Sequence, residues 1–364
     1  MVGAGVIGCA IAFELARRDV SVQLVDERAA GQGATQASAG ILAPYIEAAH
    51  SEQLFELTAR GLTLFDEFTS RLAADNGTSV LYRRTGTLQV ATDEQALLQL
   101  RNQAARLDAQ GIVVGLLDGK AVRAEEPYVT EDALGGLVIP AHGFVAAGEL
   151  TRALAAAARR HGAQVVEGRR VRRVLPAKND AIVETDRGSL SAAVVVLAAG
   201  SWSPHVEVRG VTASLPVHPV RGQLLRLAWR GPAVRRVTWS DRCYLVPWDD
   251  GTLLVGATVE DAGFDERTTV AGVRDLLDAA AELMPHAWTC GFVDARAGLR
   301  PATPDEMPIV GRSSVHANVV YATGHYRNGI LLAPLTAQLV ADLLVDDHAD
   351  PLLSSLAPGR FGVL

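Results

Sequence analysis

The chain has 364 residues, of which 49% are apolar, and a net charge of −7. This composition predicts a soluble globular protein with a core large enough for two intertwined domains, and the negative charge disfavours nucleic acid as a partner. The longest unbroken apolar run, Ala192 to Ala199, is too short to span a membrane, and no basic segment leads into a signal-like core, so we expect a protein that is neither membrane-spanning nor exported. Three widely spaced cysteines without a CxxC predict neither a disulfide framework nor a zinc site, which favours the reducing cytoplasm.

A glycine-rich turn opens the chain. Gly3, Gly5 and Gly8 fit GxGxxG, a pattern that lets the backbone approach a pyrophosphate at the start of a helix. Periodicity predicts that helix from Val6 to Arg18, and the alternating stretch Val20 to Glu27 predicts a strand that ends in acids about 20 residues after the turn. These features favour a dinucleotide site. The alternative is a turn that only packs a helix against a sheet.

The strand that normally precedes such a turn is short of residues, because only Met1 and Val2 stand before Gly3. A buried strand usually has about five residues. We therefore expect the natural protein to begin upstream of Met1.

The middle of the chain mixes helical and strand patterns. A loop of small residues over Gly31–Pro44 is too long for a simple connection and permits close backbone approach. Helices are predicted at His50–Asn76, Asp93–Gln110 and Glu149–His161. Strands are predicted at Thr85–Thr92, Ala163–Val166, Val171–Leu175 and Ala193–Ala198. The last of these lies in the run AAVVVLAAGSW, which is apolar from Ala192 to Ala199 and then reaches Gly200, as expected for a buried strand of a parallel sheet.

From Val217 to Val255, short strands broken by Gly, Pro and Asp indicate a second, antiparallel sheet that is a candidate to face the substrate. A strand at Asn318–Ala322 is followed by a loop that enters a long helix over Thr323–Leu344. The basic cluster of Arg169, Arg170, Arg172 and Arg173 alternates on a predicted strand, which places the charges toward solvent and not on a nucleic-acid site.

The cofactor motifs are spread over the start, middle and end of the chain, which favours FAD over NAD. Gly324 and Gly329 bracket a loop that leads to a helix N-terminus near Ile330, where the helix dipole would stabilise the negative charge of a reduced flavin. The alternative is a loop and helix that only close the core.

Several strings carry a family resemblance: GATQASAGILAP, RCYLVP, LLVGAT, AGLRPATPDEMPIVG and GHYRNGILLAP. Their order over essentially the whole chain resembles the glycine oxidase branch of the D-amino-acid oxidase family; GLRPxTPD also occurs in D-amino-acid dehydrogenases. The resemblance implies an α/β fold, in which a Rossmann-like FAD-binding domain is interleaved with an α+β substrate domain built on a largely antiparallel sheet. We place the FAD-binding domain at residues 1–45, 135–205 and 298–364, and the substrate domain at 46–134 and 206–297.

The resemblance also implies which residues hold FAD. In the glycine turn these are Gly3, Gly5, Val6, Ile7 and Gly8; at the ribose, Asp26 and Glu27; at the pyrophosphate, Ala34 and Thr35. Ala39, Gly40 and Ile41 run past the flavin, and the backbone of Val171 contacts the adenine. The residues around the isoalloxazine are His325, Tyr326, Arg327, Asn328, Gly329, Ile330 and Leu331. The covalent-flavin cysteine of sarcosine oxidases falls near the TPD string, where this chain has no cysteine, so we expect non-covalent FAD.

Three residues match the family's substrate-carboxylate site: Arg300 in GLRP, Tyr244 in CYLVP and Arg327 in HYRNG. A planar guanidinium grips a carboxylate through two parallel hydrogen bonds, and a tyrosine hydroxyl adds a donor without a second full charge. The alternatives are a surface arginine, a core tyrosine and a helix-flanking charge. Cys243, on a predicted buried strand, is expected to be an ordinary core residue.

The implied activity is FAD-dependent oxidation of glycine, sarcosine or small D-amino acids by hydride transfer, with O2 as the final acceptor. Val259 stands where glycine oxidases often carry methionine, which leaves the preference among these substrates open. The resemblance further implies that iminoglycine feeds thiazole formation in thiamin biosynthesis, with thiazole synthase as a candidate partner, and family members often form homo-oligomers. The alternatives are a D-amino-acid dehydrogenase with another acceptor and a flavin-free scaffold that keeps the fold.

Overall fold

A computed structural model describes residues 1–48 and 51–364 of the chain. Its first sheet includes the N-terminal residue Val2. Its order in space is β8 (Gln164–Val166), β1 (Gln23–Val25), Val2, β12 (Val195–Leu197), β20 (Val319–Thr323) and β19 (Ile309–Arg312). All neighbours are parallel except β19 and β20. The Val2 amide donates to the Val196 carbonyl at 2.9 Å, and the Ala198 amide donates to the Val2 carbonyl at 2.8 Å. Val2 therefore occupies the position of the central strand.

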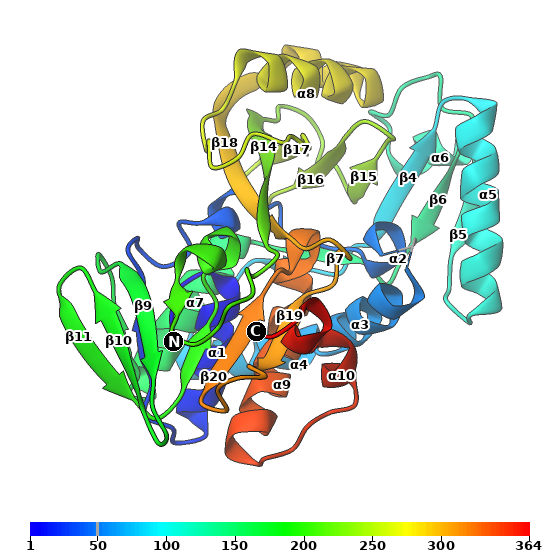
Figure 1. Cartoon of the computed structure of the whole chain (residues 1–364). Helices are drawn as coiled ribbons and strands as arrows, with labels where there is room; N and C mark the ends of the chain where they lie inside the picture. Colours follow the sequence, from blue (N-terminus) through cyan, green and yellow to red (C-terminus); the bar gives the residue numbers. More distant parts are fainter. Residues whose placement is uncertain (49–50) are drawn as a thin grey trace.

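Helices cover one face of this sheet, and a small, mostly antiparallel sheet covers the other (Figure 1). The helices are α1 (Val6–Arg17), α7 (Ala147–Arg160) and α9 (Gly329–Val345). The small sheet has the order β11 (Gly188–Ala192), β10 (Ala181–Thr185), β9 (Val171–Pro176) and β13 (Glu207–Val208). Alternation along β20 explains both layers, because Val320 and Ala322 pack among the helices whereas Val319 and Tyr321 pack against the small sheet.

The helix expected over His50–Asn76 is two helices, α3 (Glu52–Thr63) and α4 (Phe65–Asn76), which meet at Leu64; His50 itself lies outside the described residues. Their apolar residues belong to the same hydrophobic core as α1 and α9, although we placed residues 46–134 in the substrate domain. The apolar periodicity continues through Leu64, with neither Gly nor Pro there, so the sequence pattern gave no signal for the break.

The second large layer is a sheet of eight strands, shown at the upper part of Figure 1. Its order is β18 (Gly291–Ala302), β14 (His218–Ala228), β17 (Thr252–Gly256), β16 (Tyr244–Pro247), β15 (Val237–Trp239), β4 (Thr87–Ala91), β6 (Gly135–Ile139) and β5 (Gly115–Asp118). Only β15 and β4 pair in parallel within this sheet as described. The strands predicted from the antiparallel pattern after Val217 are thus present as β14 to β17.

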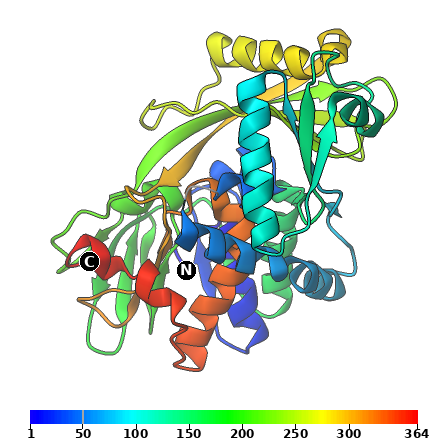
Figure 2. The same cartoon turned by 90° about the vertical axis from the view of Figure 1, so that its right-hand side faces the viewer.

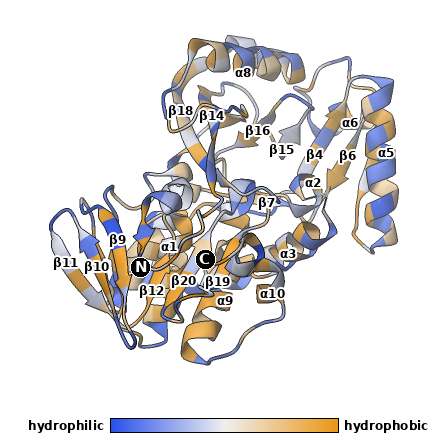
Figure 3. Ribbon diagram, in the orientation of Figure 1, coloured by the Kyte–Doolittle hydropathy of each residue, from blue (hydrophilic) through white to orange (hydrophobic). Residues whose placement is uncertain are grey.

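Helices on the outside of this sheet shield its apolar face. They are α5 (Glu94–Ala109), α6 (Gly119–Glu125) and α8 (Val270–Leu283). Figure 2 shows α5 standing along the strands and α8 lying across their far end, and Figure 3 shows the hydrophilic side of α5 turned outward. The long strands β14 and β18 pair over most of their length and connect the two large sheets.

Short elements complete the chain. A three-stranded sheet has the order β2 (Ile41–Leu42), β7 (Gly143–Val145) and β3 (Tyr82–Arg83). The short helices are α2 (Pro44–Glu47), α10 (Leu352–Leu356), η1 (Ala34–Ala37), η2 (Gly200–His205), η3 (Pro285–Thr289), η4 (Tyr326–Asn328) and η5 (Pro358–Phe361).

Among the described residues, one helical stretch is long and apolar enough to cross a membrane by length and composition, residues 326–345. Its most apolar window is 72% buried inside the protein. The apolar residues of α9 pack against α1 and α3, so the core of the fold accounts for the composition of this helix.

Candidate active site

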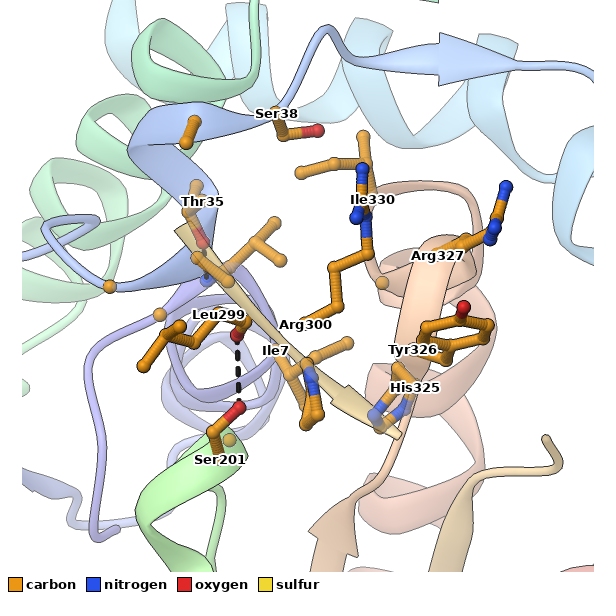
Figure 4. A pocket seen from close by; sticks show the side chains of 18 of the residues that line it. Ile7, Thr35, Ser38, Ser201, Leu299, Arg300, His325, Tyr326, Arg327 and Ile330 are labelled. Atoms are coloured by element: carbon orange, nitrogen blue, oxygen red, sulfur yellow. Dashed lines mark hydrogen bonds between the residues drawn. The ribbon is translucent and has the colours of Figure 1, made fainter. Parts of the chain in front are cut away.

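A cavity of about 700 Å³ begins where β1, β12 and β20 end and continues to the inner ends of β16, β17 and β18. The carboxyl ends of parallel strands are where α/β sheets bind ligands. Figure 4 shows side chains from the first helix, the small-residue loop, β18 and the loop before α9 around one space. The motifs that the sequence spreads over the whole chain therefore meet at one place.

The glycine turn lines one end of this cavity. Gly3 has φ +102°, and a side-chain carbon there would lie 2.4 Å from the Ala198 carbonyl oxygen; at Gly8 such a carbon would lie 1.9 Å from the Gly3 carbonyl oxygen. α1 begins without a side-chain cap and without an acid in its first turn. The Val6 amide donates to Oγ1 of Thr35 at 3.2 Å, which ties the turn to the small-residue loop. The positive end of the α1 dipole thus faces a space suited to a diphosphate.

The neighbouring acids Asp26 and Glu27 have different partners. The Asp26 carboxylate accepts hydrogen bonds from the Ala4 amide at 2.6 Å and the Arg28 amide at 2.8 Å. Burial raises the pKa of Asp26, and these two hydrogen bonds oppose the rise. Glu27 forms an ion pair with Arg170, and both line the cavity beside Val171. Asp26 therefore fixes the glycine turn as well as lining the nucleotide end.

The loop before α9 forms the opposite wall. Nε2 of His325 lies 3.0 Å from Oγ1 of Thr336, and burial lowers the pKa of His325 to about 3, so the imidazole is neutral and fixes the loop to its own helix. Tyr326 has φ +46°, and the guanidinium of Arg327 lies 5.2 Å from the centre of its ring. α9 also begins without a side-chain cap. A second helix dipole therefore reaches the cavity.

Arg300 is held from behind by main-chain carbonyl groups. Its Nη1 donates to the Thr258 carbonyl at 3.0 Å and to the Arg221 carbonyl at 3.4 Å. Figure 4 shows Arg300 and Arg327 reaching from β18 and η4 toward the same end of the cavity. With Nη1 occupied by protein, the rest of the guanidinium fork is left for a planar anion.

A buried polar network supports those carbonyl groups. The Arg221 side chain is 8% exposed and pairs with Glu260 at 2.6 Å and with Asp265 at 3.1 Å. Glu260 also accepts hydrogen bonds from Oγ1 of Thr258 and from Nε2 of Gln223. Separating the partners of such a buried pair is costly, because it leaves an uncompensated charge. The network therefore fixes the strand ends around Arg300.

Tyr244 is half-buried and lies on β16 next to Arg300. Burial raises its pKa to about 12, whereas the charge of Arg300 lowers it, so the hydroxyl remains a protonated donor at neutral pH. A side-chain carbon on Gly256 would lie 2.5 Å from its ring, and the Trp239 ring centre is 5.0 Å from that of Tyr244. These contacts fix the ring of Tyr244 at the wall of the cavity that Arg300 also lines.

Most residues predicted for the site line this cavity. At its wall lie Gly3, Gly5, Val6, Ile7, Asp26, Glu27, Ala34, Thr35, Ala39, Gly40, Ile41, Val171, Tyr244, Arg300, His325, Tyr326, Arg327, Gly329 and Ile330. Gly8, Asn328 and Leu331 are not at the wall: Gly8 allows α1 to approach the turn, Leu331 packs in the core, and Asn328 is buried. Sequence reasoning missed Glu47 and Trp202, which also line the cavity and belong to no motif.

A family model described as FAD dependent oxidoreductase matches residues 1–343. The chain belongs to this family. The predicted resemblance is therefore confirmed, and the cofactor is FAD. The cavity fits this cofactor, because two uncapped helix ends and a glycine cradle supply positive dipoles and room for a dinucleotide.

Three comparisons define the relatives of this FAD dependent oxidoreductase. It is 36% identical to a bifunctional protein ThiO/ThiG of Trichormus variabilis over 99% of this chain and 54% of that protein. It is 34% identical to a glycine oxidase of Geobacillus kaustophilus, over 94% of this chain and 92% of that protein. The crystal structure of glycine oxidase from Geobacillus kaustophilus has a TM-score of 0.94 at 33% identity, covering 99% of this chain and 97% of that one.

The predicted fold class is confirmed by that likeness, whereas the domain boundaries stay a prediction. The chain spans about half the length of the first of the curated relatives that it matches. In those relatives the matched part is joined to further sequence.

Proposed function

We propose that this chain is an oxidase that deaminates glycine and other small amines and amino acids such as sarcosine and D-alanine. The observation that carries the proposal is the Arg300 guanidinium, which two carbonyl groups hold from behind at the end of the cavity where α9 begins. The printed name of a relative, glycine oxidase, supports the same substrate class.

The side chains orient the substrate. Arg300 grips the carboxylate through two parallel hydrogen bonds, the Tyr244 hydroxyl donates a third, and Arg327 adds positive charge at the exposed mouth. FAD, when bound, supplies the acceptor for a hydride from the α-carbon, and O2 then takes up both electrons to give H2O2. Because these groups fix the α-carbon in one place, catalysis rests on orientation and electrostatics.

The imine product from glycine is iminoglycine, which we propose is used for thiazole formation in thiamin biosynthesis. The name ThiO/ThiG of relatives in which the matched part is about half of a longer protein supports a thiazole synthase as partner. We further propose that the enzyme works in the cytoplasm as a homo-oligomer.

The decisive experiment measures O2 consumption and H2O2 release by purified, yellow protein with glycine, sarcosine and D-alanine. We expect equal amounts of O2 consumed and H2O2 formed. Reduction of a dye without H2O2 would instead identify a dehydrogenase, and a colourless protein without either activity would identify a flavin-free scaffold.

A further inference from the structure

Glu47 is an acid at the substrate end of the cavity that the mechanism above does not use. It is the last residue of α2 and lines the cavity together with Arg300, Arg327 and Tyr244. Its charge acts on Tyr244 and Arg327, and the charges of Arg327 and Arg300 act on it in turn. The four side chains therefore form one electrostatic group, although they come from four separate elements.

The other acids at the cavity wall are already engaged or lie elsewhere. Asp26 accepts two main-chain hydrogen bonds, and Glu27 pairs with Arg170 at the nucleotide end. Asp241 is exposed in the turn before β16. Within the described part of the chain, Glu47 has neither a hydrogen bond from another side chain nor an ion pair within 4.0 Å. Its carboxylate is thus available to a ligand.

The short helix that carries Glu47 is anchored on both sides. The Tyr45 amide donates to Nε2 of His142 at 3.3 Å, and Nε2 of Gln103 donates to the Tyr45 carbonyl at 2.9 Å. The Glu47 amide donates to the Ala43 carbonyl at 3.1 Å, which closes the turn. The position of Glu47 relative to α5 and to the turn between β6 and β7 is therefore fixed by the fold.

An amino acid reaches this site as a zwitterion. The two guanidinium groups attract its carboxylate but repel its ammonium group. The two charged groups cannot move apart, because both are bonded to the same α-carbon. An ammonium nitrogen also has no lone pair, so it must lose a proton before the α-carbon can lose a hydride. A carboxylate beside the arginines would serve both purposes, because it attracts the ammonium group and can take up its proton.

We propose that Glu47 binds the ammonium group of the substrate and accepts a proton from it. In this step an N–H bond of the ammonium group breaks, its electron pair stays on nitrogen as the lone pair, and an O–H bond forms on the Glu47 carboxylate. The inference rests on the proposed amine oxidation. Burial raises the pKa of Glu47 against the opposing charges of Arg327 and Arg300, which favours proton acceptance.

The test compares Glu47→Gln with wild type in the flavin-loaded enzyme. Two ligands are used: glycine, which has both charged groups, and acetate, which has only the carboxylate. We expect the variant to raise the KM for glycine by roughly 10-fold or more, the usual size of a lost charge-assisted contact. Acetate, followed by the change in flavin absorbance, should bind equally well or more tightly, because a repelling negative charge has been removed.

The pH profile gives a second readout. In Glu47→Gln, kcat/KM for glycine should rise about tenfold per pH unit across the range where wild type is level, since only glycine that is already deprotonated in solution reacts. Glu47→Asp keeps the carboxylate and should recover part of the activity. Glu56→Gln, an equal charge change on the exposed side of α3, is the matched control and should behave as wild type.

The outcomes separate the two proposals. If wild type oxidises glycine and Glu47→Gln binds glycine and acetate more weakly by the same factor, Glu47 is structural and the inference is wrong. Kinetics and a pH profile equal to those of wild type would overturn the inference as well. A yellow wild-type protein that binds acetate but oxidises no amine would overturn the proposed function, and the role of Glu47 with it.

Discussion

A side-chain carbon on Gly222 would lie 2.3 Å from the guanidinium carbon of Arg300. Gly222 stands on β14 opposite Gly298 of β18, two residues before Arg300. The guanidinium therefore occupies the space that the side chain of any other residue at position 222 would fill, so the glycine of GQLL leaves room for Arg300.

Gly222→Ala should displace the guanidinium while the protein still folds, because the atoms in the way are the far end of a flexible side chain. We expect the KM for glycine to rise at least ~10-fold, the lower limit for losing a charge-assisted contact, with FAD content unchanged. Steady-state kinetics on flavin-matched protein measures this. Gly291→Ala on the same strand as Arg300 is the control, since its new carbon would meet Ala228 at an ordinary 3.6 Å. Equal kinetics in both variants would show that Arg300 tolerates the displacement.

Arg300→Ala should leave FAD bound but reduce the turnover of small amino acids. A charge-assisted pair contributes ~1.5–3 kcal/mol, so kcat/KM should fall roughly 10- to 150-fold, with most of the loss in KM. Arg300→Lys should be intermediate because it restores the charge without the fork. Steady-state kinetics with glycine, sarcosine and D-alanine on flavin-matched variants measures this. A wild-type KM in flavin-loaded Arg300→Ala would show that another group anchors the carboxylate.

His142 should make the protein less stable in acid. The Tyr45 amide can only donate, so Nε2 accepts and Nδ1 donates to Oγ1 of Thr87 at 2.8 Å. Burial lowers the pKa of His142 to about 3 from its usual 6.5. Between pH 6.5 and 3, His142 is therefore protonated in the unfolded chain but neutral in the folded chain. The free energy of unfolding falls as the pH drops through this range, by up to ~1.4 kcal/mol per pH unit.

Urea unfolding at several pH values measures that slope. His142→Gln should flatten it without abolishing it, because buried His325 acts in the same direction. His348→Gln, at an exposed position, is the control. A slope that His142→Gln leaves unchanged would mean that other groups cause the loss.

FAD should be released completely by acid precipitation, with a colourless pellet. Cys9 is buried against the Ala4 carbonyl, and burial raises its pKa to about 12. Cys243 lines the cavity, but burial raises its pKa to about 11, so at neutral pH it is a thiol and a poor nucleophile. The flavin absorbance of the supernatant checks this, and a yellow pellet would show covalent attachment.

Local patterns were enough to predict the nucleotide end of the site. Glycine spacing, the strand before Asp26 and the uncapped start of α1 are all set by neighbours in sequence, so the pattern contains them. The sheet order could not be predicted in this way, since β1 pairs with β8 and β12 with β20 across more than a hundred residues.

The support of the substrate end was likewise absent from the sequence pattern. Arg300 depends on the carbonyl groups of Thr258 and Arg221, and every residue has a carbonyl group, so no residue type identifies them. Glu47 has no motif around it, and only the contacts of α2 with α5 and with the turn before β7 bring it to the cavity. Only tertiary contacts determine whether such residues reach the cavity.

One strand, β18, both contacts the small-residue loop and carries Arg300. Gly298 is so close to the small-residue loop that a side-chain carbon there would lie 2.8 Å from that of Ala37, and Arg300 follows two residues later. The distance from the small-residue loop to Arg300 is thus spanned by consecutive peptide units, which are nearly inextensible. If the outer part of the eight-stranded sheet tilts to admit a ligand, the tilt pivots beyond Arg300. Arg300 would then keep its distance from the small-residue loop, because the peptide units between Gly298 and Arg300 do not stretch.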